Sequence, residues 1–388
     1  MESGVASFTE AGHSEATRRN TIVVGAGPAG LALGACLKRA GIPCLILEQD
    51  NAVGATWRGH YDRLHLHTDK MHSALPFAPF PTDYPRYPSR LQLIEYLEAY
   101  ARTFQLAPSF GQRVTSARHE SGCWRIQTQE TCYHASNLVV AAGCNREPNI
   151  PSWPGQADFR GAVLHASRYR NGVPFKGQAV LVIGFGNSGG EIAIDLHEHG
   201  ARPSLAVRSP VNVIPRELFG IPILAIALAQ RRLPPRWADA LNAPILRAVM
   251  GDLARLGLRK SSRGPMQQIR HDGRAPLIDV GTIDLIKRGD IRICPAVERF
   301  TETGVVFDDG SQRRFAAVIL ATGYRARVDA FLEGASAAQD PQGTPLSSGC
   351  ASPIPGLYFC GYHIASTGML REIGLEAVRI AASIARIM

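Results

Sequence analysis

The chain has 388 residues, with 42 lysines and arginines against 33 aspartates and glutamates, which gives a formal net charge of +9. Its length suits two domains with separate cores, and a composition of 45% hydrophobic and 19% charged residues excludes a disordered chain. The positive charge is scattered and favours anionic ligands such as nucleotides and carboxylates. Because no basic run contains interleaved aromatic residues, the sequence predicts no nucleic-acid partner.

The N-terminal residues and the cysteines indicate the cellular setting. Residues 1–20 are polar and lack the apolar core of a signal peptide, so we expect a flexible leader there. The longest apolar run, residues 219–229, contains a proline and is too short to span a bilayer. The cysteines show neither C-x-x-C nor zinc-like spacing, which argues against a disulfide reductase and favours a reducing, cytoplasmic setting. The oligomeric state is left open.

A glycine-rich loop follows a short apolar strand at residues 21–24 and precedes a helix at about 29–40. Such a loop offers backbone N–H groups and a helix N-terminus to a pyrophosphate. The next strand ends in Glu48, an acid that suits the free 2′-hydroxyl of an adenosine ribose. The predicted ligands of this unphosphorylated dinucleotide, FAD or NAD, are Gly25, Gly27, Pro28, Ala29, Gly30, Glu48 and Gln49.

The segment beyond the second strand holds further candidates. Because ligands in such sheets lie at the carboxyl ends of the strands, we expect Thr56, Trp57, His67 and Thr68 to border a flavin. The alternative is a surface turn with a core tryptophan. His65 and His67 lack a third ligand nearby, so no metal site is predicted.

The sequence then predicts an extended proline-rich loop at residues 76–88, a helix at 91–104 with Ser89 as its N-cap, and a β-hairpin at 111–126. The backbone of Val114, in this hairpin, is a candidate neighbour of an adenine.

A second glycine-rich loop follows the apolar strand at residues 179–183. The strand after it ends in Arg208, and an arginine at this point suits a 2′-phosphate rather than a free hydroxyl. The predicted NADP ligands are Gly184, Gly186, Asn187, Ser188, Gly189, Arg208 and Ser209. A chain with one site of each kind is most simply a flavoprotein reduced by NADPH.

Two buried strands that end in small residues, 137–143 and 317–323, predict the domain organisation. They fit two crossings between a host domain and an inserted one. We therefore predict an α/β fold with two Rossmann-like domains: an FAD-binding domain at residues 21–150 and 316–388, and an NADP-binding domain at 151–315 inserted into it. The end of the second crossing adds three NADP contacts, Ala321, Thr322 and Gly323.

The NADP domain contains an atypical insertion at about residues 217–258, with an apolar stretch at 221–228 and an amphipathic helix from 243. A helical cap on its own domain is the simplest interpretation. A helix on a membrane surface, or a gate for an apolar substrate, are the alternatives. A final helix is expected at residues 372–387.

The motif Phe159-x-Gly-x-x-x-His-x-x-x-Tyr169 lies between the two glycine loops. Its four defining residues are Phe159, Gly161, His165 and Tyr169. The motif resembles the fingerprint of flavin-containing monooxygenases. The segments Tyr61-Asp-Arg-Leu, Gly184-Phe-Gly-Asn-Ser-Gly and Asp279-Val-Gly-Thr-Ile-Asp resemble the YUCCA branch of that family. The chain departs from the family in Ala141-Ala-Gly143, in residues 66–70, which lack an asparagine, and in residues 362–369.

The resemblance implies a single-component monooxygenase that uses FAD, NADPH and O2 and acts through a C4a-hydroperoxyflavin. In this family the flavin carries the difficult chemistry, so no catalytic side chain is assigned, and Asn187, Ser188 and Arg208 are expected to position NADP. The implied reaction is oxidative decarboxylation of a 2-oxo acid such as indole-3-pyruvate. The alternatives are N- or S-oxygenation of a soft nucleophile, an NADPH-dependent flavin reductase that oxygenates nothing, and a catalytically silent FAD-binding protein.

Overall fold

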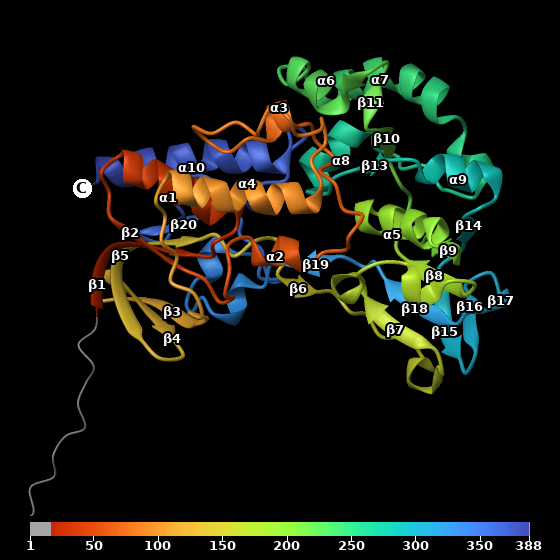
Figure 1. Cartoon of the computed structure of the whole chain (residues 1–388), viewed down its shortest axis with the longest axis horizontal. Coiled ribbons are helices and arrows are strands. Elements are labelled where there is room, and N and C mark those ends of the chain that lie inside the picture. Colours follow the sequence, from red (N-terminus) through yellow and green to blue (C-terminus); the bar gives the residue numbers. More distant parts are fainter. Residues whose placement is uncertain (1–16, 388) are drawn as a thin grey trace, which may run out of the picture.

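The computed structural model describes residues 17–387 as a mixed α/β molecule built on two sheets (Figure 1). The first sheet has six strands, from residues 17–140 and 357–359. The second has five strands, all from residues 162–320. The chain therefore leaves the first sheet, builds the second, and returns to the first near its end.

The first sheet contains β1 (Thr17–Val24), β2 (Cys44–Leu47), β3 (Val114–Glu120), β4 (Cys123–Thr128), β5 (Cys132–Val140) and β20 (Leu357–Phe359). Their order is β2-β1-β5-β4-β3, with β20 paired to β5. The pairs of β1 with β2, β1 with β5 and β20 with β5 are parallel, whereas β3 and β4 form the predicted hairpin. The helices α1 (Pro28–Arg39), α4 (Arg90–Thr103) and α10 (Met369–Arg386) cover one face (Figure 1).

Apolar side chains on both faces hold this sheet in place. Val23 packs in the same buried cluster as the three covering helices, whereas its neighbour Ile22 packs in a cluster on the opposite face. Helix α4 begins where the sequence predicted, because the Ser89 hydroxyl accepts the Gln92 N–H at 3.3 Å and the Gln92 side chain accepts the Ser89 N–H at 2.9 Å.

The start of β1 corrects one expectation. Residues 1–16 of the predicted leader lie outside the described residues, but residues 17–20 belong to β1. Their backbone continues the parallel pairing with β5, in which Thr17 lies opposite Tyr133. The polar sequence of residues 17–20 gave no sign of a strand, because pairing with a distant strand uses backbone N–H and C=O groups and does not require apolar side chains.

The second sheet contains β7 (Ala162–His165), β8 (Ala179–Ile183), β9 (Arg202–Ala206), β14 (Arg292–Cys294) and β18 (Ala317–Leu320), in the parallel order β14-β9-β8-β18-β7. Strands β8 and β18 are apolar throughout, as expected for a parallel sheet covered on both faces. Helices α5 (Asn187–Glu198) and α9 (Thr282–Arg288) cover one face (Figure 1). The antiparallel strands β15 (Val297–Thr301), β16 (Gly304–Phe307) and β17 (Gln312–Arg314) lie near the other.

Helices α6 (Ile223–Ala229) and α7 (Pro235–Met250) of the insertion lie at the upper edge of the molecule (Figure 1). The helical insertion is longer than the predicted 217–258, since residues 213–279 also contribute β10 (Val213–Pro215), β11 (Glu217–Leu218), β12 (Ile221–Pro222), η4 (Leu253–Leu256), α8 (Pro265–Asp272) and β13 (Leu277–Asp279). Helix α7 begins at Pro235, eight residues before the predicted start, because a proline at the first helical position lacks only an N–H that has no partner there. Within residues 17–387 no helix is long and apolar enough to cross a bilayer.

Short elements connect these layers. They are α2 (Ala55–Arg58), α3 (Lys70–Ser73), the pair β6 (Glu147–Pro148) and β19 (Tyr324–Arg325), and the 3-10 turns η1 (Gln156–Asp158), η2 (Ala166–Arg168), η3 (Val173–Phe175), η5 (Val328–Ala330) and η6 (Ser336–Ala338). The proline-rich segment 76–88 forms no helix or strand, as predicted.

Candidate functional site

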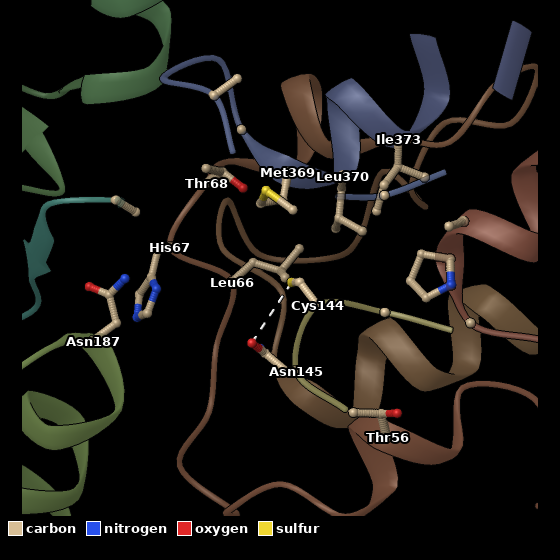
Figure 2. Close-up of a pocket in the computed structure, with 18 of the residues that line it drawn as sticks. Thr56, Leu66, His67, Thr68, Cys144, Asn145, Asn187, Met369, Leu370 and Ile373 are labelled. Atoms are coloured by element: carbon tan, nitrogen blue, oxygen red, sulfur yellow. Dashed lines mark hydrogen bonds between the residues drawn. The ribbon is translucent and has the colours of Figure 1, made fainter. Parts of the chain in front are cut away.

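A cavity of about 510 Å³ runs between the first glycine loop, the N-terminus of α5 and the helical insertion. Eleven of the twelve residues predicted to contact the first dinucleotide line it, and Gly30 is the exception. Figure 2 shows part of its wall, with Asn187 and His67 on one side, Thr56 and Ile373 toward the other, and Leu66, Thr68, Cys144 and Met369 between them. The cavity therefore joins segments that lie far apart in the sequence.

The first glycine loop leaves the N-terminus of α1 open toward this cavity. Gly25 has a φ of +109°, and a Cβ there would lie 2.6 Å from the Ala141 carbonyl oxygen. A Cβ on Gly30 would lie 1.9 Å from the Gly25 oxygen, so Gly30 permits the helix to pack on the loop. Gly27 is the N-cap, has no side-chain cap, and has no neighbour within 4 Å of an added Cβ. The free N–H groups of the first turn suit a phosphate.

Glu48 follows β2 beside this loop, and its carboxylate is fixed by two backbone donors. The Ala26 N–H donates to Oε2 at 2.7 Å and the Asp50 N–H donates to Oε1 at 3.0 Å. Glu48 is buried and lines the cavity with Gln49 and Val114. Its remaining lone pairs suit ribose hydroxyls, as the sequence predicted for this position.

The loop after α2 connects the two sheets through a buried ion pair. His67 Nε2 donates to Glu191 Oε1 at 2.5 Å, and Arg63 Nη1 lies 3.7 Å from Glu191 Oε2. Glu191 belongs to α5 and is only 2% exposed. Nearby Tyr61 is also buried, and burial together with the Glu191 charge raises its pKa well above its usual value. His67 therefore reaches from the loop after α2 to the helix that follows the second glycine loop.

The second glycine loop repeats the geometry of the first. Gly184 also has a φ of +109°, and its added Cβ would lie 2.4 Å from the Ala321 carbonyl oxygen. A Cβ added to Gly189 would lie 2.0 Å from the Gly184 oxygen, and Gly186 is the uncapped N-cap of α5. Two independent stretches of sequence thus build the same turn, whose free N–H groups suit a phosphate.

Of the residues predicted for NADP, Asn187 and Ser188 line the cavity. The Asn187 side-chain oxygen accepts the Ile278 N–H at 2.8 Å, which orients its amide, and Figure 2 shows Asn187 on the same wall as His67. Arg208 and Ser209 lie outside the cavity and are exposed. The guanidinium of Arg259 donates to the Arg208 carbonyl, so a second arginine that the sequence analysis missed lies beside the predicted 2′-phosphate position.

Ala321, Thr322 and Gly323, also predicted for NADP, do not line the cavity. The Thr322 hydroxyl donates to the Asn149 carbonyl at 2.5 Å, and the Gly323 carbonyl accepts the Asn149 N–H at 2.9 Å. Gly323 and Gly143 share a φ of +84°, so the ends of the two crossings are conformationally alike.

The fingerprint residues stabilise this crossing and do not line the cavity. The Ser167 N–H donates to His165 Nδ1 at 3.1 Å, so Nε2 carries the proton and donates to the Gly323 carbonyl at 3.0 Å. Burial lowers the pKa of His165, which keeps the ring neutral. Gly161 permits close approach to the Ala316 carbonyl, and the Tyr169 hydroxyl donates to Asp195 at 2.5 Å. Phe159 packs in the core beneath the second sheet.

The insertion supplies a wall of the cavity that no motif marked. Its apolar members include Leu218, Ile223, Leu224, Ile226, Ala227, Leu246, Met266 and Ile269. One polar pair lies among them: the amides of Gln230 and Asn242 exchange two hydrogen bonds, of 3.0 and 2.8 Å. Arg146 is the one lysine or arginine among the described lining residues, and it donates to the Arg327 carbonyl at 2.6 Å. Within residues 17–387 no three metal-binding side chains cluster.

Comparison with known proteins adds to this geometry. Residues 22–215 match the family described as pyridine nucleotide-disulphide oxidoreductase. The chain is 44% identical over 319 residues to the indole-3-pyruvate monooxygenase YUCCA1 of Oryza sativa subsp. japonica, covering 81% of this chain and 79% of that protein. It is 42% identical to YUCCA6 of Arabidopsis thaliana, over 84% of this chain and 80% of that one. A flavin-containing monooxygenase from Stenotrophomonas maltophilia shares the fold, with a TM-score of 0.74, 23% identity and coverage of 96% and 99% of the two chains.

Proposed function

Because this chain is an oxidoreductase that belongs to the YUCCA branch of the flavin-containing monooxygenases, we propose that it uses FAD, NADPH and O2 to decarboxylate a 2-oxo acid such as indole-3-pyruvate. The balanced reaction consumes the 2-oxo acid, O2, NADPH and a proton, and it yields the shortened acid, carbon dioxide, water and NADP+. The observation that carries the proposal is the cavity that joins the first glycine loop to Asn187 and the apolar insertion.

The first glycine loop is our proposed FAD site. Bound FAD, reduced by NADPH, would supply the activation of O2. The N-terminus of α1 would bind the pyrophosphate, and Glu48 would accept hydroxyls of the ribose. Trp57, His67 and Thr68 line the same cavity and would border the ring system. The space beside Gly27 and the tight contact at Gly30 both fit a dinucleotide.

The second loop is our proposed NADPH site. The N-terminus of α5 would bind its pyrophosphate, and Arg208 with Arg259 would bind the 2′-phosphate. Asn187, held by its bond to the Ile278 N–H, would position the nicotinamide end in the shared cavity. This assignment divides the chain into an FAD-binding domain at residues 21–150 and 316–388 and an inserted NADP-binding domain at 151–315.

The helical insertion is our proposed substrate site. Apolar side chains from α6, α7 and α8 suit an aromatic ring, and they also keep water from the reacting centre. Gln230 and Asn242 are the polar side chains within this wall that are free of formal charge, and their N–H2 groups suit a carboxylate or carbonyl oxygen. We therefore propose that the insertion, for which a helical cap on its own domain was the simplest interpretation, is instead a substrate-binding layer.

The test uses the purified holoenzyme, indole-3-pyruvate and isotopically labelled O2. We expect NADPH oxidation with release of carbon dioxide, and one labelled oxygen in the carboxylate of the product. Reducing the protein without air and then mixing it with O2 should yield a transient absorbance distinct from oxidised and reduced flavin. Stoichiometric hydrogen peroxide with no labelled product would instead favour a flavin reductase. Labelled N- or S-oxides from an amine or a sulfide, with no product from indole-3-pyruvate, would favour the other monooxygenase alternative.

A further inference from the structure

The outward face of the helical insertion carries a row of exposed apolar side chains. Trp237, Leu241, Ile245 and Val249 recur every four residues along α7 and are 61%, 58%, 38% and 41% exposed. Side chains at this spacing share one side of a helix. Figure 1 shows α6 and α7 at the upper edge of the molecule, away from both sheets. A continuous exposed row of this kind indicates a surface that contacts a partner.

A neighbouring side of α7, about 100° around the helix, is already used by the protein. Asn242 and Leu246 line the cavity, and Ala238 is fully buried. The helix therefore has two apolar sides, of which the protein covers one. We call this exposed row on α7, formed by Trp237, Leu241, Ile245 and Val249, the outer apolar face.

Basic side chains surround this face. Arg231, Arg232, Arg236 and Arg247 are exposed, and none forms an ion pair with the described residues. Asp239 is the single acid between residues 219 and 251. It is buried and caps α8, since its carboxylate accepts the N–H groups of Met266 and Gln267. Residues 219–251 therefore present exposed arginines and no exposed acid, while Asp252, just beyond them, lies 3.7 Å from Arg255.

We propose that the outer apolar face docks on the surface of an anionic lipid bilayer, with α7 lying in the plane of the interface. Apolar side chains enter the boundary between headgroups and acyl chains, a tryptophan suits that boundary, and arginines contact the lipid phosphates. Two copies of this chain are a poorer match, because a two-fold contact through the row would bring the arginines of one copy against those of the other.

Docking in this orientation has a consequence that rests on the proposed function. The cavity-lining side of α7 is next to its exposed row, so the lipid surface and the proposed substrate site would lie on neighbouring sides of the same helix. An apolar substrate that partitions into the interface would then be concentrated next to the site. Lipid binding itself needs no turnover, so failure of the proposed reaction leaves the docking proposal standing.

The test measures sedimentation of the full-length holoenzyme with vesicles. One set contains phosphatidylcholine with phosphatidylserine, and the other contains phosphatidylcholine alone. We expect binding to the anionic set that weakens as salt rises. The double variant Trp237→Ser with Leu241→Ser should bind about tenfold more weakly. A matched double variant, Val173→Ser with Leu346→Ser, removes two side chains that are 62% and 66% exposed elsewhere and should bind like the wild type.

The outcomes separate the lipid surface from other occupants. Wild-type protein that stays in the supernatant with anionic vesicles, or a Trp237/Leu241 variant that binds as well as the wild type, overturns the proposal. Light scattering in the absence of lipid supplies a second measurement. A dimer that the same variant dissociates would assign the outer apolar face to a second copy of this chain. Because both substituted side chains are exposed, the thermal unfolding temperature should be unchanged, which shows that the variant is folded.

Discussion

Replacing Glu191 by alanine tests whether the ion pair between the two sheets holds them together. Glu191 is 2% exposed and meets two side chains, the His67 ring at 2.5 Å and the Arg63 guanidinium at 3.7 Å. The variant removes the carboxylate and leaves both partners without it. Removing one member of a buried ion pair costs about 3–5 kcal/mol. We therefore expect the free energy of unfolding to fall by about 3 kcal/mol.

Glu198 provides a control on the same helix. Its carboxylate also binds Arg63, at 2.9 and 3.1 Å, but its side chain is 50% exposed. An exposed ion pair contributes at most about 1 kcal/mol, so Glu198→Ala should change stability little. The two variants share the substitution, the helix and one partner, and they differ in burial. The difference between them therefore isolates the effect of removing the buried carboxylate.

Urea unfolding followed by circular dichroism, with flavin content held constant, measures both variants against the wild type. We expect a clearly lower midpoint for Glu191→Ala and a midpoint near the wild-type value for Glu198→Ala. Equal midpoints for the two variants would refute this expectation, because burial of the carboxylate would then make no difference.

Three further predictions concern the cofactor loops and one histidine. Gly30→Ala places a Cβ against a backbone carbonyl and should lower the free energy of unfolding of the flavin-free protein by about 2 kcal/mol, measured by urea unfolding. The Cβ of Gly27→Ala meets open space, so this variant should chiefly weaken FAD binding, measured by flavin fluorescence. Arg208→Ala and Arg259→Ala should each raise KM for NADPH about tenfold and leave KM for NADH unchanged, and a parallel rise for both cofactors would contradict the 2′-phosphate assignment. Burial lowers the pKa of His165 below 6.5, so on acidification the unfolded chain takes up the proton first and the free energy of unfolding should fall as pH drops through about 6.5. His165→Gln should make this fall smaller in urea midpoints measured between about pH 7.5 and 5.5. An unchanged pH dependence would count against a neutral buried His165.

The sequence determined the features that depend on neighbouring residues. Each glycine loop requires a positive φ and a contact too close for a Cβ, which only glycine allows, so both loops were recognised without coordinates. The start of α4 was predictable because the side chains of Ser89 and Gln92, three positions apart, each accept a hydrogen bond from the backbone N–H of the other residue. Glu48 and Arg208 were predicted as ribose-side ligands because strand length sets their distance from the loops. Short-range sterics and hydrogen bonds suffice for all of these.

The tertiary structure decided the features that join distant segments. His67 and Glu191 are 124 positions apart, and no local pattern pairs them. Arg259 became a candidate ligand of the 2′-phosphate only because the structure shows its bond to the Arg208 carbonyl. The structural role of the fingerprint residue His165 became visible only from its hydrogen bond to the Gly323 carbonyl. The two apolar sides of α7 look alike in sequence, and only packing shows which side lines the cavity. Such contacts depend on how whole elements pack, and the sequence of one element does not contain that information.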